Sequence, residues 1–111
     1  MKIKKYTEVE KNPVNMEGAK DVDIRLLINS SDQAPNFAMR MFEVAPGGHT
    51  PLHCHANEHE IFIVHGSGTF VYEGTEHPFE AGHIIFVDPD AEHCFKNTSD
   101  AVLKFLCLVP E

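Results

Sequence analysis

The feature that most constrains the fold is a succession of short β-rich runs, each ended within a few residues by glycine, proline, asparagine or aspartate. Apolar residues stand at every second position from Val22 to Ile28, as expected of a strand with one buried face. Further strands are expected over residues 37–44, 61–64, 69–72, 84–87 and 101–109. Because no segment keeps a helical period of 3.6 residues, the pattern predicts an all-β sandwich or barrel with little helix.

The length of 111 residues suits one domain. We expect residues 21–111 to form the barrel, and the polar residues 1–20 to form an N-terminal arm or an edge strand. The net charge of -8, with no basic run after the first five positions, argues against a nucleic-acid partner. The three cysteines form neither a disulfide framework nor a zinc pair, and we expect reduced, mostly buried thiols.

The longest apolar stretch, residues 101–109, is interrupted by Lys104 and is too short to cross a bilayer. The basic N-terminus is not followed by the apolar core of a secretory signal. The sequence therefore predicts a cytoplasmic protein with no membrane partner.

Eight histidines in so short a chain are the strongest chemical signal. His53 and His55 are two positions apart, so both imidazoles project to one side of an extended strand. Glu60 follows at the start of a predicted strand, and His93 lies beyond a later one. Strands distant in sequence face the same interior of a closed barrel, so these side chains can meet there.

The same residues resemble the two motifs of the cupin superfamily. The first spans Gly47 to Gly66 and contains His53, His55 and Glu60; the second runs from Gly82 to Asn97 and contains His93. The resemblance implies an antiparallel jelly-roll β-barrel that holds a metal inside through those four residues. It also implies a small single-domain bacterial cupin, of the quercetinase-like or oxalate decarboxylase-like kind, that forms a homodimer.

Three imidazoles and one carboxylate suit one divalent transition metal. We expect manganese or iron first, with nickel, zinc, copper or cobalt as alternatives. Other readings are a closed tetrahedral zinc site, or side chains that never meet. His59 competes with Glu60 for the fourth position, because neighbours on a strand face opposite sides and only one can coordinate. We prefer Glu60, on parity with Phe62 and Val64 and on the motif.

The same alternation predicts the wall of a substrate pocket. Phe62 and Val64 should face inward with Glu60, and Phe95 should follow His93. Arg40 could bind a substrate carboxylate, or pair with an acidic residue on the surface. The remaining histidines, His49, His65, His77 and His83, are expected at the surface.

The resemblance implies a metal-dependent enzyme of the dioxygenase or decarboxylase type, acting on a small organic acid, enol or polyphenol. Glu60 would be both ligand and proton acceptor. The alternatives are a cupin isomerase, or a non-catalytic module that binds a metal or a metabolite.

Overall fold

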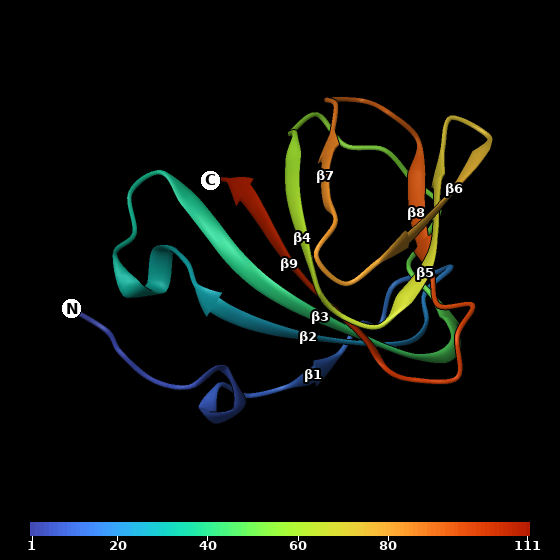
Figure 1. The fold of residues 1–111 in the computed structure, drawn as a ribbon. Helices are drawn as coiled ribbons and strands as arrows, with labels where there is room; N and C mark the ends of the chain where they lie inside the picture. Colours follow the sequence, from blue (N-terminus) through green and yellow to red (C-terminus); the bar gives the residue numbers. More distant parts are fainter.

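The short β-rich runs form strands of one antiparallel sheet that curls on itself into the half-barrel of a jelly roll (Figure 1). The computed structural model describes all residues from 1 to 111. In chain order the strands are β1 (Asn12–Pro13), β2 (Lys20–Ile28), β3 (Phe37–His49), β4 (His59–His65), β5 (Ser67–Tyr72), β6 (Thr75–Glu80), β7 (Ile84–Val87), β8 (His93–Lys96) and β9 (Leu103–Pro110). The only helical segments are two 3-10 turns, η1 (Tyr6–Glu8) and η2 (Ser30–Asp32). The predicted all-β antiparallel fold with little helix is confirmed.

The strands are hydrogen-bonded in the order β6-β5-β8-β3-β9-β4-β7, and β2 pairs with the opposite edge of β3. The long strand β3 joins the two ends of the fold, because it pairs with β2 and β9 along its length and with β8 at His49. As a result, segments that are far apart in sequence curve around one interior (Figure 1).

All six strands expected from the sequence are present, but β6 and β8 were not anticipated. The β6 segment is mostly polar and contains Pro78, which lacks a backbone N–H and usually argues against a strand. Its position explains the exception, since β6 is an edge strand that pairs only with β5. The four residues of β8 begin and end with a basic side chain, so they lack the apolar run that marks β7, the other four-residue strand.

The alternation along β4 sets the two faces of the sheet at the site. His59, Ile61 and Ile63 are buried, whereas Glu60 and the two following even-numbered residues are exposed. Pairing with β9 brings Ile61 beside Cys107 and Ile63 beside Phe105, all of them buried. The odd-numbered residues from His59 to Ile63 therefore face the core of the barrel.

The segment before β2 is fastened to the edge of the sheet formed by β2. The strand β1 pairs with β2, and the amide of Val14 donates to the carbonyl of Val22 at 2.9 Å. Arg25 holds the preceding residues, because its guanidinium donates to the carbonyl of Val9 at 2.6 Å and to the buried carboxylate of Glu43 at 2.6 Å. This arrangement carries Val14 and Met16 to the mouth of the interior cavity.

Candidate metal centre

Four imidazoles gather at one end of the barrel interior. His59 begins β4 and His93 begins β8, while His53 pairs with His93 in an isolated β-bridge and His55 lies in the loop that follows. The ring centroid of His55 lies 4.2 Å from that of His53, 4.3 Å from that of His59 and 5.3 Å from that of His93. The expectation that His53, His55 and His93 would come together agrees with this geometry.

Three of these residues meet the distance requirement of a shared metal ion. One ring nitrogen from each of His55, His59 and His93 lies within 4.8 Å of the other two. His53 stands beside them, with its centroid 5.6 Å from that of His93. The chain therefore carries a cluster of three histidines that can bind a metal, and a fourth histidine adjoins it.

Hydrogen bonds fix which nitrogen faces the cluster in two of the rings. The Nδ1 of His53 lies 2.7 Å from the carbonyl oxygen of Pro51, and the Nδ1 of His93 lies 2.9 Å from that of Ala91. A carbonyl oxygen can only accept, so both Nδ1 atoms carry the proton and both Nε2 atoms keep a lone pair. Metal-binding histidines are held in the same way by an acceptor on the second nitrogen.

The other two rings, those of His59 and His55, have different surroundings. The Nδ1 of His59 lies 3.3 Å from the Sγ of Cys107. The Nε2 of His55 is buried and has no hydrogen-bond partner. A buried nitrogen without a partner is costly in an ordinary interior, and a metal ion would satisfy it.

The environment favours the neutral form of these imidazoles. Burial lowers the pKa of His59 to about 4, with a smaller contribution from the positive charge of Arg40. Burial is also the main cause that lowers the pKa of His55 and of His93. Neutral imidazole is the form that coordinates a metal, so the rings are ready to bind near neutral pH.

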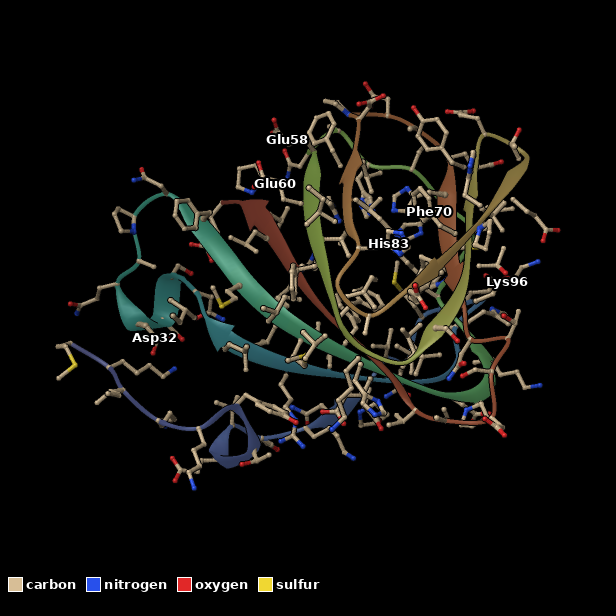
Figure 2. The ribbon with its side chains drawn as sticks, in the orientation of Figure 1. Asp32, Glu58, Glu60, Phe70, His83 and Lys96 are labelled. Atoms are coloured by element: carbon tan, nitrogen blue, oxygen red, sulfur yellow. The ribbon has the colours of Figure 1, made fainter.

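The prediction that Glu60 faces the interior is wrong. Its side chain is exposed and lies on the outer side of β4, as Figure 2 shows, away from the imidazole cluster. Glu60 pairs with Phe86 and Leu108 on the neighbouring strands, and it lines a pocket there that the imidazole cluster does not reach. His59 takes the inward position, because the two neighbours on a strand must point to opposite sides.

The pocket wall predicted by the same parity is wrong for two residues. Phe62 is 45% exposed and Val64 is 40% exposed, both on the outer face with Glu60. No sequence signal separates the faces here, because residues 61–64 are all apolar. Because both faces of β4 are apolar at these positions, the sequence does not show which residues form the core. It therefore does not show that His59 faces inward.

The interior cavity has a volume of about 530 Å³ and opens beside the imidazoles. Arg40 and Phe95 line it, as the sequence predicts, and all four clustered histidines contribute to its wall. Apolar side chains make up most of the remaining surface, and no carboxylate is among the lining residues. Arg40 is the one permanently charged group, and its buried Nε has no hydrogen-bond partner.

The remaining histidines stay away from this cluster. His65, His77 and His83 are exposed, and His49 is half-buried with its Nδ1 3.3 Å from the carbonyl oxygen of Thr50. The histidine content thus divides into one interior cluster and separate side chains outside it. No helix in the structure has the length and apolar character needed to cross a membrane.

The fold and the cluster define a jelly-roll half-barrel with a histidine site at its centre. A family model described as a cupin domain matches residues 40–109, which is more than half of the chain. The chain belongs to the cupin family.

Individual relatives have different functions. The chain is 34% identical over 100 residues to the oxalate-binding protein of Thermotoga maritima, covering 86% of this chain and 81% of that protein. The structure of the polyketide cyclase RemF from Streptomyces resistomycificus has a TM-score of 0.93 at 35% identity, covering 99% of this chain and 79% of the other. A predicted oxalate decarboxylase from Thermotoga maritima has a TM-score of 0.88 at 27% identity, covering 98% of each chain.

Proposed function

We propose that this cupin holds one divalent transition metal through the Nε2 atoms of His53, His55, His59 and His93 and acts on an enol or polyphenol bound in the adjoining cavity. The observation that carries the proposal is the junction of an imidazole cluster with an apolar cavity of about 530 Å³. That volume lies within the range of small-molecule sites and accommodates a ring system.

The ligand atoms favour some metals over others. We expected manganese or iron from a set that included a carboxylate, but the interior cluster contains only imidazoles. Imidazole nitrogen suits iron, nickel, copper and zinc, whereas carboxylate and water suit manganese. We therefore propose iron, nickel, copper or zinc as the bound metal in preference to manganese. The cavity beside the cluster favours an open coordination site over a closed structural zinc site.

The chain's own residues would orient the substrate. The apolar wall, including Phe95 and Phe105, can pack against the rings of the substrate and keep water from them. The positive charge of Arg40 and its unpaired Nε can stabilise a substrate oxygen that becomes negatively charged. A metal at the histidines would supply Lewis-acid stabilisation of adjacent enolate or phenolate oxygens.

The cavity lining contains no carboxylate, so the chain offers no acidic side chain there as a general base. This favours substrates whose acidic proton is on carbon between carbonyls or on a phenol. The similarity to a protein named as a polyketide cyclase supports the enolic class. Oxygen insertion and decarboxylation, which the resemblance implied, are alternative outcomes of the same experiment.

The test compares substitutions of two neighbouring residues of β4, His59 and Glu60, in protein loaded with a chosen metal. Protein stripped of metal is reloaded with zinc, iron, nickel or copper, and substrate binding is followed by the absorbance shift of a flavonol or an aromatic 1,3-diketone on ionisation. Products are identified by mass spectrometry, and oxygen uptake is recorded in parallel.

The variant His59→Ala should lose more than tenfold in metal affinity together with the absorbance shift, because His59 faces the cluster. Glu60→Ala should retain both within about threefold, because Glu60 faces outward. A similar loss in the two variants would contradict the ligand set. Metal binding without ionisation or turnover of any substrate would contradict the enzymatic proposal.

A second function, the binding of a small dicarboxylate, is favoured by Arg40. Its guanidinium lies in the same cavity as the histidines, and its Nε is unpaired. A dicarboxylate could reach the metal with one end and Arg40 with the other, and the similarity to a protein named as oxalate-binding supports this alternative. Titration calorimetry with oxalate should show binding that Arg40→Gln weakens at least tenfold, and equal affinity in the variant would exclude this role.

A further inference from the structure

A buried sulfur lies between Arg40 and His59. Cys107 belongs to β9 and is only 1% exposed. In the sheet it pairs with Arg40 of β3 on one side and with Ile61 of β4 on the other, two residues beyond His59. Its Sγ lies 3.0 Å from the Nη2 of Arg40 and 3.3 Å from the Nδ1 of His59. The thiol therefore contacts both functional groups at the centre of the cavity wall.

The direction of these hydrogen bonds follows from the donors present. A guanidinium can only donate, so the sulfur accepts from Arg40. A neutral imidazole carries one proton, and when the Nε2 of His59 binds a metal that proton must be on Nδ1. The sulfur then accepts a second hydrogen bond, from His59, as a carbonyl oxygen does for His53 and His93.

We propose that Cys107 is a positioning residue that orients His59 toward the metal through a sulfur held in place by Arg40. The inference rests on the metal site of the proposed function and adds a residue that binds neither metal nor substrate directly. His53 and His93 are oriented by backbone carbonyls, which no substitution removes. His59 instead depends on a side chain, so its orientation can be changed by mutation.

Cys94 provides a matched control for the loss of a buried thiol. It is 4% exposed, but it lies outside the lining of the cavity. No hydrogen bond joins its side chain to His59 or Arg40, whereas the sulfur of Cys107 bonds to both. A general effect of removing a thiol from the interior should appear in both positions, and an effect on His59 should appear only at Cys107.

The experiment measures cobalt binding to the full-length protein by competition with a chromophoric chelator, and records the visible spectrum of the cobalt-loaded protein. Cys107→Val fills the space of the thiol but accepts no hydrogen bond. Cys107→Ser keeps an acceptor of similar size. We expect Cys107→Val to lower the cobalt affinity by about 10-fold to 100-fold, the range found when the outer partner of a metal-binding histidine is lost. The intensity of the cobalt spectrum should also change.

Cys107→Ser and Cys94→Ala should each stay within about threefold of the unmodified affinity. Thermal unfolding of the metal-free variants, measured separately, reports any loss of folding, and Cys107→Ser keeps the test valid if the valine variant is unstable. An equal loss of affinity at Cys94 and Cys107 would overturn the inference. The inference would also be overturned if Cys107→Val kept the cobalt affinity and spectrum of the unmodified protein while His59→Ala lost binding. In that case the proposed metal site would stand. Failure of the unmodified protein to bind cobalt would overturn both the proposed metal site and the role of Cys107.

Discussion

Acidification should destabilise the metal-free protein through the buried histidine cluster. His59 is only 7% exposed, and burial lowers its pKa to about 4. In the unfolded chain the pKa of a histidine is about 6.5. The unfolded state therefore binds more protons than the folded state between these values, so the stability is present above about pH 6.5 and is lost as the pH falls.

The size of the effect follows from the two pKa values. A difference of about 2.5 units corresponds to about 3.4 kcal/mol when the titration is complete. Relative to pH 8, His59 should account for a loss of about 2 kcal/mol at pH 5 and about 3 kcal/mol at pH 4. His55 and His93 add to the loss, because burial lowers the pKa of each of them too.

The assay is urea unfolding of chelator-treated protein from pH 8 to pH 4, with His59→Gln as the control. Glutamine does not titrate, and the carboxylates titrate alike in both proteins, so the difference between the two stability profiles isolates His59. The free energy of unfolding should fall more steeply in the unmodified protein by about 2 kcal/mol at pH 5. Parallel profiles would refute the reasoning, because His59 would then have an ordinary pKa in the folded state.

Two further predictions concern the scaffold and its outer face. Asn97 is 2% exposed and its amide donates to the carbonyls of Val44 at 2.9 Å and Ala101 at 2.8 Å, so Asn97→Ala should lower the free energy of unfolding by about 2–4 kcal/mol. Urea unfolding measures this, and a loss below about 1 kcal/mol would contradict it. Ile84 and Phe86 are 79% and 58% exposed on the outer face of β7, which is the surface we expect a homodimer to bury. Replacing both with aspartate should convert a dimer to a monomer in light scattering, and a monomeric unmodified protein would contradict the expectation.

The interior position of His59 shows what local sequence patterns leave undecided. Alternation along β4 indicates that His59 and Glu60 face opposite sides, but apolar residues follow at all of the positions 61–64. Which set is buried depends on the pairing of β4 with β7 and β9, whose inward residues include Val87 and Phe105. This pairing joins segments far apart in the chain, so no local pattern could reveal it.

The sequence by itself determined the fold class and three of the four clustered histidines. The short alternating runs and their turn residues predict an all-β sandwich or barrel, and the spacing of His53 and His55 predicts two imidazoles on one side of an extended segment. Only the tertiary structure decided that His59 completes the cluster, that Arg40 and Cys107 adjoin it, and that Glu60 faces outward. The physical reason is that spacing sets relative directions along one strand, whereas the curl and register of the sheet decide which direction is the interior.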